Sequence, residues 1–438
     1  MRSLPCAALA AALFVLSASA QDVAGPGFAL APAAYPGAPA FGATTTLSNG
    51  DIVVFDGLDV FQYASNGALL FHLGSVPSFV FPSFVLAHPS EDEIYVGESS
   101  GGTIMRFFTG QTSNPDVIAT LPFNYDAAIF DGSALFVSAA TCGFGCGNQI
   151  WSIDLSDLQA HQVAQVPGAS GPLAFDGQGN LYYATASAAF PPPPNPTKIL
   201  RWSAAQLAGP SVLGLADAQF LGVGFEGAAR LAFDRRVGAL YLAEVNFTSG
   251  ANRIRRVLGG AAQSPILLEG QGFRSITNLC LQSGSGAARF GAYQPASDAF
   301  LTYTTTDFVA PPERFELLPR RPSATLTGAG TSGPGPFALE LHDGPPGGFA
   351  RLVLCAPARF HTPERVFQTS PLPLFFGADL LGGPAGLAGK VYLPLDASGS
   401  LELDYVNPGG LVGQWAAQFE VFDSAPLRVA GTSSAAFL

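Results

Sequence analysis

Five oxygen-bearing side chains stand where the strands of a repeated β unit could present them to a ligand. Asp126, Glu226 and Asn278 lie before or within the first apolar run of a unit. Glu98 and Glu244 follow the second run. A hard cation such as calcium binds carboxylate and amide oxygens when several of them converge. These five residues are therefore candidate ligands for a divalent cation. The alternative is that they cap turns or accept hydrogen bonds from backbone N–H groups.

One further motif has the spacing of a hydrolase nucleophile. Residues 97–101 read Gly-Glu-Ser-Ser-Gly, which matches the pattern Gly-x-Ser-x-Gly. A nucleophile elbow requires a strand, a sharp turn and then a helix. The runs on both sides of this motif are typical of strands. The sequence therefore favours a glycine-rich loop between two strands over a serine hydrolase.

The cysteines indicate an oxidising compartment. Cys142 and Cys146 are separated by Gly-Phe-Gly, and the two glycines allow so short a loop to close. We predict a disulfide between them, because a metal site would need two further soft ligands and none is near in the sequence. Cys280 and Cys355 lie within apolar runs, and we expect both to be buried thiols.

The N-terminus has the features of an export signal. Arg2 precedes an apolar run over residues 7–16, which is too short to span a bilayer. Residues 17–20 supply the small side chains that precede a cleavage before Gln21. We expect residues 1–20 to be a signal peptide and the mature protein to be secreted, periplasmic or at the cell surface. No later run is long and apolar enough to predict a membrane-spanning segment.

The composition favours one fold class and argues against one class of partner. Of the 438 residues, 48% are hydrophobic and only 12% are charged, a share too small for long surface helices. Abundant Gly and Pro suit short strands joined by tight turns. The net charge is −12 and the only lysines are Lys198 and Lys390. A nucleic-acid partner is therefore not expected, because phosphate binding needs a basic surface.

The larger part of the chain repeats one pattern at intervals of roughly 40–60 residues, near the length of a propeller blade. An apolar run leads to a turn, and a second, aromatic-rich run follows. A third run, often with Ile and Arg, and a short fourth run complete the unit. The turn and second run recur at 49–55, 93–97, 132–137, 179–184 and 238–243.

Packing explains why such units would form a ring. A four-stranded unit has two apolar faces, and it cannot bury both alone. Stacking the units around a circle buries both faces and removes unsatisfied ends. With a degenerate last unit at 276–303, the count is six. We predict an all-β chain with a lead-in over 21–39 and a six-bladed β-propeller over 40–317.

The units resemble NHL-repeat and SMP-30-like (gluconolactonase-type) six-bladed propellers. The likeness lies in the run from Phe81 to Pro89, continuing through 94–98 to 103–106. In gluconolactonase-like enzymes a Glu, an Asn and an Asp hold the metal, and Glu226 is the position that best matches this set. The resemblance departs where an acidic residue is expected after the second run, because Ala139 and Thr185 stand there in two units.

A second module is expected after residue 317. Pro319 to Pro322 read as a linker, and short apolar runs separated by turn signals follow. We predict a small antiparallel β-sandwich over 318–438. It resembles the C-terminal modules of exported planctomycete-type bacterial proteins, through residues 414–423 and 430–434.

Three functions fit these features. The first is a non-catalytic interaction platform for a protein or carbohydrate ligand. The second is a metal-dependent, lactonase-like hydrolase or a lyase on the same ring. The third is a surface-layer or matrix component. The residues that meet in the central channel discriminate the first two, because convergent Glu, Asn and Asp side chains would favour the enzyme.

Overall fold

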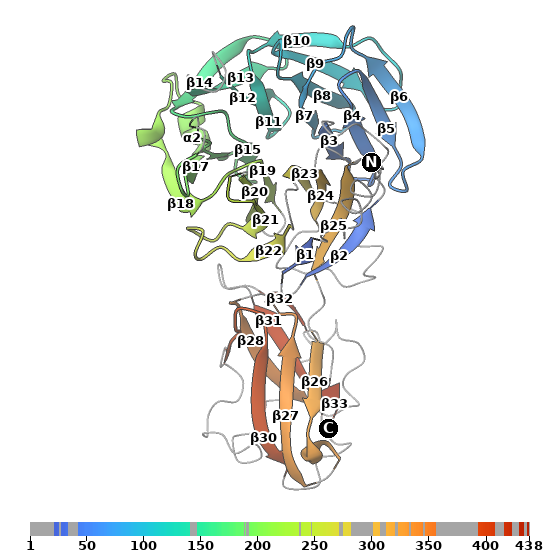
Figure 1. Ribbon diagram of the computed structural model, residues 1–438, viewed down its shortest axis with the longest axis vertical. Helices are drawn as coiled ribbons and strands as arrows, with labels where there is room; N and C mark the ends of the chain where they lie inside the picture. Colours follow the sequence, from blue (N-terminus) through green and yellow to red (C-terminus); the bar gives the residue numbers. More distant parts are fainter. Residues whose placement is uncertain are drawn as a thin grey trace, which may run out of the picture.

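The computed structural model is almost entirely β, with six sheets in a ring and two further sheets below them in Figure 1. The structure describes residues 22–25, 28–33, 43–140, 147–187, 189, 192–235, 238–246, 248–270, 275–281, 301–306, 312–319, 323–332, 334–344, 347–355, 393–407, 416–422, 429–432 and 436–437. Its helices are short: α2 (Ala204–Leu207), η1 (Leu215–Asp217) and η2 (Ala329–Thr331). Within these ranges, no helix has the length and hydropathy to cross a membrane.

Each of the first four blades is a four-stranded antiparallel meander in chain order. Blade 1 comprises β3 (Ala43–Thr46), β4 (Ile52–Phe55), β5 (Asp59–Tyr63) and β6 (Leu69–Ser75). Blade 2 comprises β7 (Pro82–Ala87), β8 (Glu93–Glu98), β9 (Thr103–Phe108) and β10 (Asp116–Thr120). Blade 3 comprises β11 (Asn124–Ile129), β12 (Ala134–Ala140), β13 (Asn148–Asp154) and β14 (Ala160–Val166). Blade 4 comprises β15 (Leu173–Phe175), β16 (Leu181–Ala184), β17 (Thr197–Trp202) and β18 (Gln219–Phe225). The repeated second runs are the second strands, as predicted.

The N-terminal segment completes blades 5 and 6. Blade 5 comprises β19 (Arg230–Asp234), β20 (Ala239–Asn246), β21 (Ala251–Arg256) and β22 (Ile266–Glu269), and β1 (Val23–Ala24) pairs with β22 as a fifth strand. Blade 6 comprises β23 (Ser275–Leu281), β24 (Leu301–Thr306), β25 (Glu313–Pro319) and β2 (Phe28–Ala33). The outer strand β2 pairs Phe28 with Pro319. The range 21–39, expected to be a lead-in, therefore supplies strands that close the ring. Local sequence pattern could not show this pairing, because its partners lie nearly 300 residues apart.

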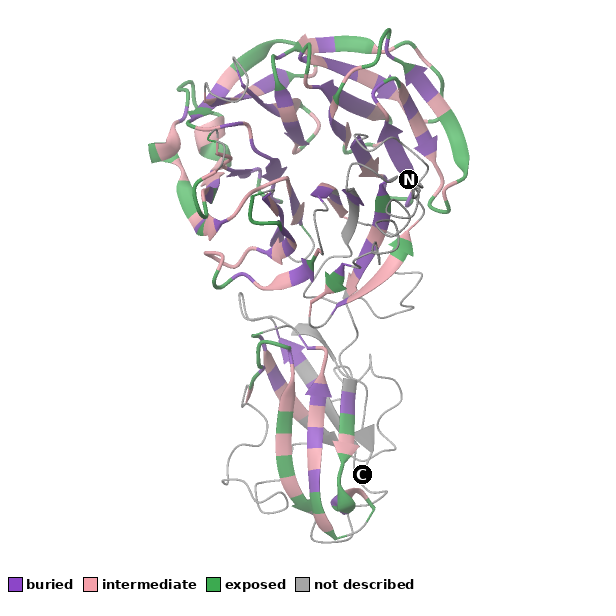
Figure 2. Cartoon of the chain, in the orientation of Figure 1, coloured by how far each residue is buried: buried purple, intermediate pink, exposed green. Residues whose placement is uncertain are grey.

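The hydrophobic core lies between successive blades. On β8, Ile94 and Val96 pack with Phe55 of blade 1, whereas Tyr95 between them packs with Leu135 of blade 3. This alternation follows from the two-residue period of a strand, which sends neighbouring side chains to opposite faces of a sheet. Figure 2 shows the resulting buried strands around the ring and the exposed outer strand β6. Each blade therefore buries both of its faces against its neighbours, which is the reason given above for expecting the repeated units to form a ring.

The C-terminal module is an antiparallel β-sandwich, as predicted. One sheet contains β26 (Ser323–Thr327), β27 (Gly335–His342) and β30 (Leu401–Asn407). The other contains β28 (Phe349–Cys355), β29 (Leu393–Pro394), β31 (Ala416–Phe422), β32 (Val429–Thr432) and β33 (Ala436–Phe437). Leu339 and Leu341 of the first sheet share a buried cluster with Phe419 and Val421 of the second.

Candidate functional site: the central cavity

The six inner strands surround a cavity of about 490 Å³ at the centre of the ring. Each inner strand stands at the end of its sheet, so one edge of its backbone has no partner strand within that sheet. Each also contacts the next inner strand around the ring. Every inner strand contributes residues to the cavity wall, among them Thr44, Ala87, Asp126, Leu173, Arg230 and Cys280. The wall therefore combines small or apolar side chains with backbone donors and acceptors that a polar ligand can use.

Arg230 and Tyr125 form a bridge across one end of this cavity, which we call the crossbar. The Arg230 guanidinium donates hydrogen bonds to the carbonyl oxygens of Ser83 at 2.8 Å and Ala229 at 3.0 Å. The Tyr125 hydroxyl donates to the same Ala229 oxygen at 3.1 Å, and the Arg230 guanidinium carbon lies 5.4 Å from the Tyr125 ring centre. Ser83 lies on β7 of blade 2, Tyr125 on β11 of blade 3 and Arg230 on β19 of blade 5. The crossbar thus spans the ring between blades 2 and 5, which lie three positions apart.

Asp126 lies beside the crossbar and is only 7% exposed. Its carboxylate accepts a hydrogen bond from the Leu173 backbone N–H at 2.9 Å. Burial raises the pKa of Asp126 above its usual range, although the nearby charge of Arg230 and the Leu173 hydrogen bond act in the opposite direction. Burial also raises the pKa of the Tyr125 hydroxyl. This end of the cavity therefore holds a carboxyl group that binds its proton more readily than an exposed aspartate does.

The opposite end of the cavity is formed where the inner strands turn toward the second strands. His88 contacts the Gly132 carbonyl oxygen of the next blade at 3.2 Å. The Glu91 carboxylate accepts hydrogen bonds from the backbone N–H and the hydroxyl of Ser48 at 2.7 and 2.6 Å. Arg235 is exposed, and it donates to the Phe130 carbonyl oxygen at 3.1 Å. Because Arg235 lines the cavity and is exposed, the cavity meets solvent at this end.

Glu98, one of the five candidate cation ligands, instead stabilises the turn that follows it. Its carboxylate accepts hydrogen bonds from the backbone N–H groups of Ser100, Gly101 and Thr103 at 2.8, 2.9 and 2.9 Å. Burial acts to raise its pKa, but these bonds and one from the Ser100 hydroxyl outweigh burial, and the net shift is downward. The same turn contains Ser99 and joins β8 to β9, so the Gly-x-Ser-x-Gly motif lies between two strands and no nucleophile elbow forms.

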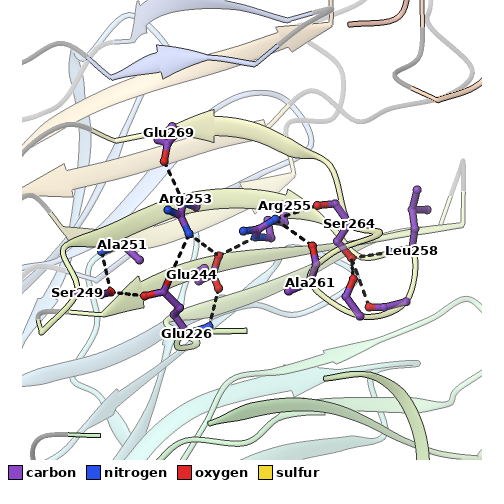
Figure 3. A network of polar contacts seen from close by, with 12 residues as sticks. Glu226, Glu244, Ser249, Ala251, Arg253, Arg255, Leu258, Ala261, Ser264 and Glu269 are labelled. Carbon is purple, nitrogen blue, oxygen red and sulfur yellow. Dashed lines mark hydrogen bonds and ion pairs between the residues drawn. The ribbon is translucent and has the colours of Figure 1, made fainter. Parts of the chain in front are cut away.

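Glu226 and Glu244 belong to a network of ion pairs in blade 5, shown in Figure 3. Glu244 accepts a hydrogen bond from Arg255 Nε at 2.7 Å and another from the Glu226 backbone N–H at 2.6 Å. Glu226 pairs with Arg253 at 3.2 Å, and Arg253 also pairs with Glu269 at 3.1 Å. Neither Glu226 nor Glu244 lines the cavity. Their carboxylates hold the loop before β19 and the strand β21 in place.

The candidate cation ligands whose side chains are described therefore do not converge on one site. Of the four whose side chains the structure describes, Asp126 alone lines the cavity. Asn278 lies on β23, and its side chain is outside the part that the structure describes. Within that part, no group of three or more His, Cys, Asp or Glu residues is arranged to hold a metal ion.

The cysteine predictions have mixed outcomes. Cys142 and Cys146 lie outside the described residues, as does the side chain of Cys355. Cys280 forms no disulfide with a described residue, and it is half-buried rather than buried. The reason is its place on the inner strand β23, where it lines the cavity and its sulfur lies 3.7 Å from the Thr44 carbonyl oxygen.

Sequence reasoning missed the crossbar and the opposite rim. Arg230 occupies the same place before the apolar run of β19 as Asp126 does on β11. That position was a usable signal, but the search for a hard cation selected only acids and amides. Tyr125 is the neighbour of Asp126 on β11, and His88 and Arg235 directly follow the inner strands β7 and β19.

Comparisons with known proteins concern the propeller architecture. No family model matches the chain, and no curated protein matches its sequence. A gluconolactonase from Xanthomonas campestris is 13% identical, with 68% of this chain and 99% of that one covered and a TM-score of 0.44. The pyranose dehydrogenase PQQ domain from Coprinopsis cinerea is 11% identical, with 68% and 97% covered and a TM-score of 0.49. A luciferin-regenerating enzyme is 12% identical, with 67% and 95% covered and a TM-score of 0.45.

The β-propeller is established by the strand pairing, and nothing further is drawn from these similarities. At such identities an architecture is shared by proteins of unrelated activity. The resemblances to NHL repeats and to the C-terminal modules of planctomycete-type exported proteins are not confirmed and stay predictions.

Proposed function

We propose that this protein is an exported, non-catalytic binding protein whose central cavity takes a short saccharide. The observation that carries the proposal is the cavity itself, which the crossbar bridges at one end and which meets solvent at the other. Its volume of about 490 Å³ lies within the range of small-molecule pockets. A bridged cavity with one solvent-exposed end suits retention of a ligand.

The lining supports a saccharide over an apolar ligand. Unpaired strand edges offer N–H and C=O groups, and Thr44, Thr45 and Thr46 bring three consecutive threonines to the wall. Sugar hydroxyls both donate and accept hydrogen bonds, so they match such a mixed wall. The lactonase-like alternative has less support, because Glu98, Glu226 and Glu244 are engaged by protein donors outside the cavity.

Cys280 provides the test. Purified protein is treated with N-ethylmaleimide while a panel of di-, tri- and tetrasaccharides is added, and alkylation is followed at Cys280 by peptide mass mapping. Binding is measured in parallel by calorimetry. A bound saccharide is expected to slow alkylation of Cys280 at least several-fold. Variant His72→Ala, on outer strand β6, is the control and should behave as the wild type. Unchanged alkylation with no binding heat for any sugar would reject the proposal.

One observation favours an enzyme as the second candidate. Asp126 combines a raised pKa with a place beside Tyr125, and a carboxyl group with a raised pKa in a cavity is a candidate general acid. A lyase or hydrolase of this kind would turn over the bound saccharide. Incubation of each binding saccharide with wild type and Asp126→Asn, followed by mass analysis of the products, distinguishes it from a binder. Product formed by the wild type alone would favour the enzyme.

A further inference from the structure

Two arginines of the cavity differ from the paired arginines of the blades. Arg106 pairs with Glu93 and Asp116, and Arg253 and Arg255 pair with glutamates of blade 5. Among the side chains that the structure describes, no carboxylate lies within ion-pairing distance of Arg230 or Arg235. The chain has a net charge of −12, so acidic residues are in excess. That two arginines in the same cavity lack an ion-pairing carboxylate therefore calls for a physical explanation.

The two arginines stand at opposite ends of the cavity. Arg230 begins β19 and forms the crossbar, whereas Arg235 follows the last residue of that strand at the solvent-exposed end. Five residue steps of extended strand correspond to roughly 16 Å. A ligand that contacts both guanidinium groups must therefore be elongated and lie along the axis of the ring.

Both guanidinium groups keep free donors. An arginine side chain has five N–H donors in a planar fork. The Arg230 side chain uses donors to the carbonyl oxygens of Ser83 and Ala229, and Arg235 uses one to that of Phe130. The remaining donors suit a carboxylate, which an arginine binds through two parallel, charge-assisted hydrogen bonds.

The acidic groups near the cavity do not cancel these charges. Glu91 is held by the backbone N–H and hydroxyl of Ser48 at the edge of blade 1. Asp126 is buried beside Arg230 with its pKa raised, so it gives up its proton less readily than an exposed aspartate. An anionic group that spans the cavity therefore meets the exposed Arg235 guanidinium at one end and the Arg230 guanidinium of the crossbar at the other.

We propose that the ligand of the cavity is an acidic saccharide, an oligouronide of two or three units, with one carboxylate at Arg235 and another at Arg230. This inference rests on the proposed function and names its ligand class. Arg235 selects the acidic saccharide at the entrance, and Arg230 binds its far end beside the crossbar.

The experiment compares two trisaccharides of equal length, neutral maltotriose and acidic tri-galacturonate, by calorimetry against the whole mature chain. The acidic sugar should bind the wild type at least about tenfold more tightly than the neutral one, as expected for a charge-assisted hydrogen-bonded pair. Variant Arg235→Gln should lose that difference, since Arg235 is exposed and its removal leaves the blades intact. Variant Arg106→Gln, on β9 outside the cavity, removes the same charge and should keep the difference.

Three other outcomes separate the two proposals. Equal affinity of the wild type for both sugars would contradict the proposal of an acidic ligand, but it would not contradict the proposed binding function. An acidic preference that Arg106→Gln loses as fully as Arg235→Gln would overturn the role of Arg235, because net charge alone would explain it. No binding of either sugar, together with unprotected Cys280, would overturn the proposed function and this inference with it.

Discussion

The Arg230 guanidinium of blade 5 donates a 2.8 Å hydrogen bond to the carbonyl oxygen of Ser83 in blade 2, on the opposite side of the ring. The two residues lie 147 positions apart in the chain. Each blade packs mainly against its two neighbours, so a bond across the centre adds a connection that the stacking of sheets does not supply. The crossbar both bridges one end of the cavity and joins distant blades.

The first prediction follows from that bond. Arg230→Leu removes hydrogen bonds from a charged donor to the carbonyl oxygens of Ser83 and Ala229. We expect its free energy of unfolding, measured by urea denaturation, to fall by about 1–3 kcal/mol. Arg235→Leu is the matched control, because Arg235 is exposed and makes one such bond, and it should lose less than about 1 kcal/mol. Equal losses in the two variants would contradict a stabilising crossbar.

The second prediction concerns ring closure by the N-terminal strand. Phe28 of β2 is 2% exposed and packs in the cluster between blades 5 and 6 with Leu317 and Tyr241. Phe28→Ala should reduce the free energy of unfolding by about 3–5 kcal/mol, the usual effect of truncating a buried aromatic side chain. Val23→Ala, at a position of β1 that is 54% exposed, is the control and should change it little. Similar stability in both variants would show that β2 is dispensable.

The ring itself was predictable from sequence because each blade buries its own second strand between two neighbours. Residues 94–96 must then be apolar on both faces, and the same requirement recurs in the second strands of blades 1 to 5. Turn residues and apolar runs are local features, so they can be read along the chain. The pairing of Phe28 with Pro319 is not local, and β2 has no distinguishing pattern, which is why its role was missed.

The site was predictable only in part, and for a related reason. Asp126 was selected by its place on an inner strand, and it does line the cavity. Glu98 is the last residue of the second strand β8 and Glu244 lies within the second strand β20, whereas the sequence placed both after these runs. Neighbouring backbone N–H and guanidinium groups donate hydrogen bonds to their carboxylates. The direction of those side chains depends on contacts within each blade, and the partner of Arg230 depends on geometry across the whole ring.

The third prediction uses the lowered pKa of Glu98. A carboxylate whose folded pKa lies below its unfolded value stabilises the fold above the unfolded pKa, and this contribution disappears as pH falls through the folded pKa. Glu98→Gln should therefore be less stable than the wild type at pH 7, by about 2 kcal/mol. The difference should shrink toward zero below about pH 4.

The control for this prediction lies in the sandwich. Glu402→Gln changes an exposed glutamate of β30, and its unfolding free energy should differ little from that of the wild type at either pH. Urea denaturation at several pH values between 3 and 7, a range that covers the titration of a glutamate, gives both comparisons. A Glu98→Gln deficit that stays constant over this range would mean that ionised Glu98 does not hold the turn.

The fourth prediction tests whether the blade 5 carboxylates serve structure or a cation. Glu244 is 1% exposed and bonds Arg255, whose side chain is 11% exposed, so Glu244→Gln leaves this arginine without its counter-charge. We expect a loss of about 3–5 kcal/mol in the free energy of unfolding. Glu269→Gln removes a partner of Arg253 that is 49% exposed, and it should cost less than about 1 kcal/mol.

Calcium distinguishes the two interpretations of this network. If Glu244 and Glu226 are held by Arg253 and Arg255, then calcium or EDTA leaves the melting temperature of the wild type unchanged, and calcium does not stabilise either variant. A cation bound by these carboxylates would instead raise the melting temperature of the wild type, by mass action on the folded state. That increase would be lost in Glu244→Gln and retained in Glu269→Gln. Such a pattern would indicate a metal site in place of the ion-pair network and would favour the lactonase-like hypothesis over the binding protein.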